Sequence, residues 1–113
     1  MKYEKIRTKF KKYGDTHMQV YRDGDWAIYE CVSPTNRVRY EVVIIKRRDA
    51  CNVYGRLYPP MEVYPASEQW GAYGWTILGT EDDAVAFLKK KREAKKLTSR
   101  AKVTLNRRRT RPA

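Results

Sequence analysis

Few side chains in this sequence have the type and spacing that catalysis or metal binding requires. His17 is the only histidine, and Cys31 and Cys51 do not form a CxxC pair. A zinc site with four Cys or His ligands cannot be assembled from these three residues. Walker and GxGxxG patterns, whose glycines let the backbone cradle phosphates, do not occur either. We therefore predict that the protein is not an enzyme and has no resident metal or cofactor.

Two groups of carboxylates have a simpler structural explanation than metal binding. Asp23 and Asp25 flank Gly24 in a pattern typical of a tight turn. The acidic residues 81–83 follow Thr80, and a Thr-x-x-acid sequence is the capping box that opens a helix. Nuclease sites generally draw their acids from separate strands with a lysine nearby. We therefore interpret residues 81–83 as a helix N-terminus.

The chain carries a formal net charge of +12, and that charge is unevenly distributed. Residues 1–12 contain six Lys or Arg residues against Glu4, whereas residues 13–88 contain seven against eleven Asp or Glu residues. Residues 89–113 hold twelve Lys or Arg residues against Glu93 alone. A mildly acidic middle with cationic ends favours a polyanionic partner, most often nucleic acid and less often an anionic membrane surface.

We predict a small accessory protein whose cationic C-terminal residues contact nucleic-acid phosphates with modest sequence specificity. Arginines in a flexible tail can fork onto phosphates or enter a minor groove. The sequence does not distinguish DNA from RNA, or single strands from double strands. The predicted binding residues are Lys89, Lys90, Lys91, Arg92, Lys95, Lys96, Arg100, Lys102, Arg107, Arg108, Arg109 and Arg111, together with the strand-end cations Lys46, Arg47 and Arg48.

The residue pattern predicts an α+β fold that would position these cations. We expect an antiparallel β-meander of about four strands, with an N-terminal basic helix and a C-terminal helix packed on one face. Within residues 2–13, Tyr3, Ile6, Phe10 and Tyr13 form one apolar stripe at helical spacing. Two alternatives for this segment are a basic arm that orders on nucleic acid and a helix that lies on a membrane surface.

Strands are expected at residues 17–22, 26–32, 37–48 and 74–78, with a tight turn at residues 23–25. In the longest strand, Val38, Tyr40, Val42 and Ile44 share one face, and Arg37, Arg39, Glu41, Val43 and Ile45 share the other. Its apolar second half favours burial on both faces. The Pro-containing residues 49–67 are expected to be extended, with one short edge strand at most.

The C-terminal helix is expected to pack through an apolar face and then to become strongly basic. Its packing residues are Ala84, Val85, Phe87 and Leu88. Cations near a helix C-terminus are favoured by the helix dipole, so part of this charge needs no ligand. Beyond Arg100 the sequence has little to bury. We predict one domain at residues 1–98 and a flexible, disordered basic tail at residues 99–113.

The stretch EQWGAYGWTILG, residues 68–79, concentrates aromatic side chains and glycines just before this helix. We expect Trp75 and Ile77 to lie on the buried face of the last strand. Residues 57–88 contain no Lys or Arg, which argues against a platform on which bases stack. Exposed aromatic residues also favour protein contacts. An alternative protein interface would therefore use Tyr58, Tyr64, Trp70 and Tyr73.

Two runs of the sequence resemble small bacteriophage-encoded proteins that have no known activity. These runs are WAIYECVSPTNRVRYEVVIIKRR and YPASEQWGAYGWTILGTEDDAVAFLKKK. The shared pattern is a Trp-bearing strand, a Tyr-Glu-Val strand and the motif Tyr-Pro-x-Ser-x-x-Trp-Gly-x-Tyr-Gly before a helix. This resemblance implies a viral or mobile-element origin. Trp70-Gly71 is also similar to the nucleic-acid-binding domain named for its Trp-Gly-Arg motif, although Ala72 stands in place of the arginine.

A bacteriophage origin leaves two other functions open. One is a host-takeover or anti-defence protein that binds a host protein through the Tyr/Trp-rich surface. The other is a virion or RNA-packaging component whose basic tail neutralises the genome. The sequence shows no signal peptide and no apolar run of membrane-spanning length, so we expect a cytoplasmic protein, in the host cytoplasm if viral. An uncovered edge strand could pair two copies, which leaves monomer and homodimer as alternatives.

Overall fold

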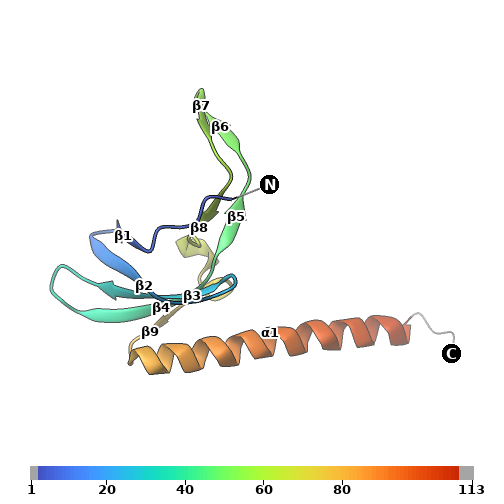
Figure 1. Cartoon of the computed structure of the whole chain (residues 1–113). Helices are drawn as coiled ribbons and strands as arrows, with labels where there is room; N and C mark the ends of the chain where they lie inside the picture. Colours follow the sequence, from blue (N-terminus) through green and yellow to red (C-terminus); the bar gives the residue numbers. More distant parts are fainter. Residues whose placement is uncertain (1–2, 110–113) are drawn as a thin grey trace.

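The computed structural model describes the backbone of residues 3–109 and the side chains of residues 3–95 (Figure 1). The main sheet has five antiparallel strands in the order β1-β2-β3-β4-β9. Two further strand pairs, β5–β8 and β6–β7, extend from it. The strands of the main sheet are β1 (Lys9–Lys12), β2 (Asp15–Asp23), β3 (Trp26–Val32), β4 (Val38–Ile44) and β9 (Gly74–Ile77). The remaining elements are β5 (Lys46–Arg48), β6 (Cys51–Val53), β7 (Arg56–Tyr58), β8 (Met61–Val63), the 3-10 turn η1 (Ser67–Gln69) and the helix α1 (Glu81–Arg109).

The predicted meander is confirmed, because β2, β3, β4 and β9 pair in an antiparallel sheet. The turn expected at residues 23–25 joins β2 to β3, with Asp23 opposite Trp26 and Gly24 at φ 62°. A glycine with positive φ at the first central position is what a two-residue hairpin loop requires. The long strand expected at residues 37–48 is divided at Ile45. Its first part, β4, pairs with β9, and its second part, β5, pairs with β8.

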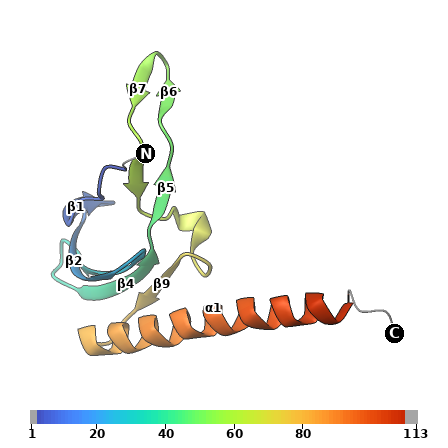
Figure 2. The same cartoon turned by 45° about the vertical axis from the view of Figure 1, so that its right-hand side comes forward.

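The sheet buries both of its faces. Alternating residues of β3 point to opposite sides, so Ala27, Tyr29 and Cys31 belong to one apolar cluster and Ile28 belongs to another. The sheet curls, and α1 lies against its outer side (Figure 2). The inner side is covered by the N-terminal segment and by the chain that follows β8. We call this inner side the concave face.

Helix α1 begins with the predicted capping box. The Thr80 backbone N–H donates to the Asp83 carboxylate at 2.9 Å, and the Asp83 N–H donates to the Thr80 hydroxyl at 3.2 Å. Ala84 and Leu88, one turn apart, are fully buried against Ile28 and Val42. In the same cluster the ring of Trp75 stacks on Trp26 with a centroid distance of 5.9 Å. Trp75 and Ile77 thus share one face of β9 as expected, where they are partly buried against the cluster that includes Ala84 and Leu88.

The N-terminal basic helix expected at residues 2–13 is wrong. Residues 9–12 form strand β1, and Glu4 makes a bridge to Met61, the first residue of β8. Tyr13 and Gly14 have φ of 53° and 82°, and they connect Lys12 to its partner Asp15. Two successive positive φ angles make the type I′ turn, whose twist suits a hairpin. The hairpin therefore prevails over the helical spacing of the apolar residues.

Residues 49–67 contain more regular structure than the sequence suggested. Strands β6 and β7 form a hairpin that stands out from the body of the molecule (Figure 2). Tyr54 and Gly55, with φ of 51° and 79°, repeat the Tyr-Gly turn of the first hairpin. We call residues 51–58 the arm. The expectation of one short strand at most is therefore wrong, because β6, β7 and β8 all lie in this region.

The backbone of the C-terminal residues is helical up to Arg109, and the expected flexible tail at residues 99–113 stays a prediction. Helix α1 continues to Arg109, well past the edge of the sheet (Figure 1). Lys, Arg, Ala and Leu are good helix formers, which explains why the backbone continues in this form. Residues 110–113 lie outside the described residues, and the division at residue 98 stays a prediction. Within the described part of the chain, α1 and η1 both lack the combination of length and apolar character that crossing a bilayer requires.

The packing of α1 on the sheet gives a direct stability prediction. Leu88→Ala removes a fully buried side chain, so the free energy of unfolding should fall by about 2–5 kcal/mol. Leu78→Ala is the matched control, because Leu78 is 82% exposed and its loss should change stability by no more than about 0.5 kcal/mol. Urea unfolding followed by tryptophan fluorescence measures both values. Equal effects of the two substitutions would contradict the placement of α1.

Candidate functional site

The described cations of α1 are largely open to solvent. Lys89, Lys90 and Lys95 are exposed, and Lys91 is partly buried. Arg92 donates a hydrogen bond to the carboxylate of Asp23 at the end of β2. The side chains of Lys96, Arg100, Lys102, Arg107, Arg108 and Arg109 lie outside the described ones, as does the whole of Arg111. One predicted phosphate contact, Arg92, is therefore partly neutralised by the body of the protein.

Two sets of predicted cations that are distant in the sequence meet at Tyr73. The Lys46 Nζ atom lies 4.7 Å from the centre of the Tyr73 ring, and the Lys95 Nζ atom lies 5.4 Å from it. One turn earlier on α1, Lys91 Nζ lies 5.5 Å from the Trp75 ring. Cations at such distances are attracted to the negative faces of the rings. The start of β5 and the middle of α1 therefore belong to one cationic surface.

The other two strand-end cations point elsewhere. Arg47 makes a two-pronged ion pair with Asp25, with nitrogen to oxygen distances of 2.6 and 3.0 Å. Arg48 lies over the ring of Tyr58 and donates to the sulfur of Met61. Of the three residues of β5, Lys46 is thus the one that joins the α1 surface.

The four residues of the alternative protein interface lie in three different settings. Tyr58 is on the arm, and Tyr73 faces Lys46 and Lys95. Tyr64 and Trp70 line a pocket on the concave face. They do not form one continuous aromatic surface. Residues 57–88 contain no Lys or Arg of their own. The fold nevertheless brings Lys46 and Lys95 from other segments against Tyr73.

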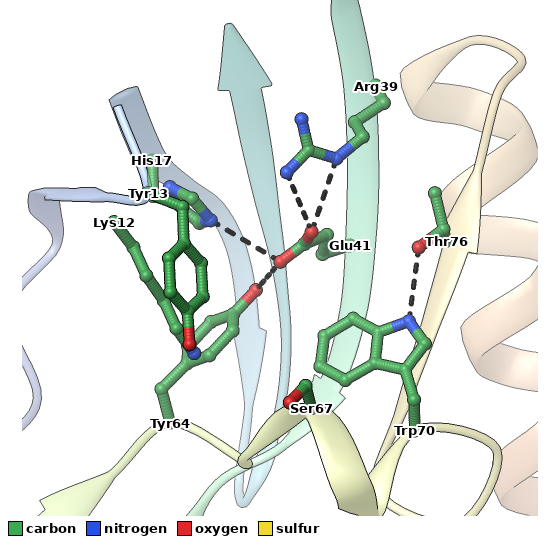
Figure 3. Close-up of a pocket in the computed structure, with 9 residues that line it drawn as sticks. All are labelled: Lys12, Tyr13, His17, Arg39, Glu41, Tyr64, Ser67, Trp70 and Thr76. Carbon is green, nitrogen blue, oxygen red and sulfur yellow. Dashed lines mark hydrogen bonds and ion pairs between the residues drawn. The ribbon is translucent and has the colours of Figure 1, made fainter. Parts of the chain in front are cut away.

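The concave face carries a pocket of about 460 Å³ that the sequence did not reveal (Figure 3). Its walls combine aromatic rings with charged groups, and its lining comes from the strands β1, β2, β4 and β9, a turn residue, the residue after β8 and the η1 region. The lining residues are Lys12, Tyr13, His17, Arg39, Glu41, Tyr64, Ser67, Trp70 and Thr76. Such a mixture of apolar walls and a few converging polar groups is typical of ligand sites.

A network of charged groups forms the floor of this pocket. Arg39 donates to Asp15 at 2.7 Å and to one oxygen of Glu41 at 3.1 and 3.2 Å. The other oxygen of Glu41 accepts a short hydrogen bond from the Tyr64 hydroxyl and lies 3.4 Å from His17 Nε2 (Figure 3). Buried charges are costly unless they are paired, so this network is well compensated. The alternation of β4 gave one signal for it, since Arg39 and Glu41 share a face with Val43.

Burial keeps two nearby groups protonated. Loss of solvent raises the pKa of the Tyr64 hydroxyl far above its ordinary value, and the negative charge of Glu41 adds to this shift. Burial, together with Glu41, also raises the pKa of the Cys31 thiol to about 12. Tyr64 is therefore a hydrogen-bond donor to Glu41 at neutral pH. Cys31 is not a free nucleophile, because the thiolate is the reactive form.

A second buried ion pair holds the N-terminal segment against β8. Glu62, only 6% exposed, accepts two hydrogen bonds from Arg22 at 2.8 and 2.6 Å. It also accepts the backbone N–H of Ile6 at 3.1 Å. The hydrogen bonds from Arg22 are the main reason that the pKa of Glu62 lies below its ordinary value. This carboxylate therefore links β2, β8 and the N-terminal chain.

The lowered pKa of Glu62 makes stability depend on pH in a defined direction. Because the folded pKa is lower than the unfolded value of about 4.3, Glu62 stabilises the fold fully above that value. Its contribution should be lost as the pH falls through the folded pKa. Glu62→Gln should therefore lower stability at pH 7 and flatten the acid limb, as measured by urea unfolding at a series of pH values. The exposed Glu68→Gln should follow the unmodified protein, and an unchanged acid limb in Glu62→Gln would refute this role.

Comparison with known proteins adds no assignment to this geometry. No protein-family model matches the chain, and no significant match is found among curated proteins or solved structures. The functional interpretation therefore depends on the arrangement of charges and aromatic rings described above.

Proposed function

We propose that this chain is a small, non-enzymatic nucleic-acid-binding accessory protein of a bacteriophage. Its phosphate-binding surface is the basic half of α1, residues 89–109, together with Lys46. The observation that carries this proposal is the meeting of Lys46 and Lys95 at Tyr73. The bacteriophage origin is proposed from the resemblance of residues 26–48 and 64–91.

The dimensions of the basic half of α1 suit a nucleic-acid duplex. At a rise of 1.5 Å per residue, residues 89–109 extend over roughly 30 Å, which is close to one helical turn of DNA. This segment contains eleven Lys or Arg residues and Glu93 as its single acid. Like charges spaced four residues apart, such as Lys91 and Lys95, repel one another. A row of phosphates would relieve this repulsion.

Tyr73 adds a second kind of contact to the surface. Its ring is partly exposed and lies close to two lysine ammonium groups. Proteins that bind single strands combine cations along the backbone with aromatic rings that stack on bases. Stacking of this kind tolerates any base, which agrees with the modest sequence specificity that we expect.

Salt dependence tests the phosphate contacts directly. With about eight contacts to duplex DNA, the logarithm of the binding constant should fall with the logarithm of salt concentration with a slope of about −7. The double variant Lys46→Ala/Lys95→Ala should reduce the steepness of this slope by about 2. Fluorescence anisotropy with labelled single-stranded DNA, duplex DNA and RNA gives the measurement.

The matched control is Lys9→Ala/Lys11→Ala, which removes the same charge from exposed positions of β1. Strand β1 lies at the far edge of the sheet from β9. This control should keep the original slope. Absence of binding at low salt, or an affinity that hardly responds to salt, would refute the proposed function.

The arm favours a second candidate function, the binding of a host protein. At its tip Tyr54 is fully exposed and Leu57 is 75% exposed. Large apolar side chains at a projecting tip are suited to insertion into a pocket of a protein partner. In this case the basic surface of α1 would assist binding to an acidic region of that partner.

A variant of the arm separates the two functions. Tyr54→Ser/Leu57→Ser should leave both stability and nucleic-acid affinity unchanged, because both side chains lie in solvent. Loss of biological activity in the native host, with nucleic-acid binding retained, would support the host-protein function. Retained activity in this variant would exclude the arm as the functional contact. Anisotropy and a phage growth assay give the two measurements.

A further inference from the structure

Three potential metal-ligand atoms converge beneath the pocket of the concave face. They are Nε2 or Nδ1 of His17, Sγ of Cys31 and a carboxylate oxygen of Glu41, and all lie within 4.8 Å of one another. The three residues come from the neighbouring strands β2, β3 and β4, and His17 lies directly opposite Cys31. All are buried, with exposed fractions of 2%, 0% and 7%.

The hydrogen bond of His17 determines which ring nitrogen faces this cluster. Nδ1 lies 3.2 Å from the backbone carbonyl oxygen of Asp15, which can only accept a hydrogen bond. The proton is therefore on Nδ1, and in the neutral ring the lone pair of Nε2 points to Glu41 at 3.4 Å. A histidine that binds a metal through one nitrogen commonly donates from the other to a carbonyl in this way.

The contact between Glu41 and His17 requires a positively charged group between their facing atoms. A nitrogen lone pair and a carboxylate oxygen repel one another unless a proton or a metal cation lies between them. Arg39 holds the Oε2 atom of Glu41, so Oε1 is the atom that faces His17. Tyr64 supplies one proton to the same Oε1 atom, and its ring lies edge-on to the His17 ring with a centroid distance of 5.7 Å (Figure 3).

The charges of the groups around this cluster are consistent with a divalent ion. Asp15 and Glu41 carry two negative charges, and Arg39 carries one positive charge. A Cys31 thiolate would make the total −2, which one divalent cation neutralises. Metal binding would break the Cys31 S–H bond, form a metal–sulfur bond and release the proton to solvent through the pocket.

We propose that His17, Cys31 and Glu41 bind a divalent transition metal of the zinc type. Nitrogen, sulfur and oxygen donors of this kind suit zinc, and three protein ligands leave a fourth position open. Donor atoms around a tetrahedral zinc lie roughly 3.5 Å apart, so the three side chains need to close by about an ångström. The open position faces the pocket, where Ser67 and Thr76 provide further polar groups.

This inference goes beyond the proposed function and does not depend on it. The metal ligands lie on the concave face, whereas the basic surface lies along α1 on the outer face. The metal would tie three strands together and bind the folded chain alone, so it should stabilise the protein. A result that the protein binds no nucleic acid would not count against the metal site. A result that it binds no metal would not count against nucleic-acid binding.

Cobalt(II) is the probe for this site, because a thiolate bound to cobalt produces an intense charge-transfer band in the near ultraviolet. The full chain, treated with chelator and then titrated with Co²⁺, should develop this band with one ion per chain. The decisive protein is Cys51→Ser, which changes a residue of the arm and leaves Cys31 as the single thiol. A band in Cys51→Ser must come from Cys31, whereas its absence would overturn the proposal.

Two ligand variants complete the test. In the Cys51→Ser background, Cys31→Ser should remove the band, and His17→Gln should weaken Co²⁺ affinity at least about 10-fold. Circular dichroism in the presence of chelator shows whether each variant is folded. A band that persists in the variant without thiols would refute the assignment. Unfolding of a ligand variant would not affect the result from Cys51→Ser.

Discussion

Burial of both faces of strand β3 is the constraint on which this structure depends. Ile28 needs the helix side of the sheet to be covered, and Ala27, Tyr29 and Cys31 need the concave face to be covered. A chain of this length has little apolar surface to spare, so each cover must come from a short segment. Helix α1 covers one face through Ala84 and Leu88. The N-terminal segment and the chain around Tyr64 and Trp70 cover the other.

The two covers use different physical interactions. The helix side is almost entirely apolar, and its rings and aliphatic groups pack closely around Trp26 and Trp75. The concave face mixes apolar packing with buried charge, because Glu41 and Glu62 are both nearly inaccessible to solvent. Every buried polar side-chain atom among the described residues has a hydrogen-bond partner. A satisfied network of this kind favours one arrangement of the strands, since slipping the register would leave charges unpaired.

Local patterns predicted the parts of the fold that local interactions decide. The capping box at Thr80, the turn at Gly24 and the alternation of β4 could all be identified from residues near in sequence. The N-terminal segment could not, because the spacing of Tyr3, Ile6 and Phe10 suits a helix until pairing with β2 and β8 is known. The Tyr-Gly pairs that form the β1–β2 and β6–β7 turns were not recognised as turns from the sequence, because tyrosine is unusual at positive φ.

The candidate sites were predictable to different degrees for the same reason. Charge counts identified α1 as the basic element, but they gave no indication that Lys46 lies beside Lys95. The cluster of His17, Cys31 and Glu41 depends on strand register, and its members are separated by ten or more residues. A motif search for closely spaced ligands fails in such a case. Only the pairing of three strands brings these side chains together.

A single-layered sheet gives the pocket and the helix a common wall. Glu41 lines the pocket, and the next residue, Val42, packs against α1 on the opposite side. A ligand that displaces the backbone at Glu41 must therefore also shift Val42 and the surface on which α1 packs. Thermodynamic linkage makes such an influence mutual: whatever binding in the pocket does to a contact made on the helix side, that contact does equally to binding in the pocket.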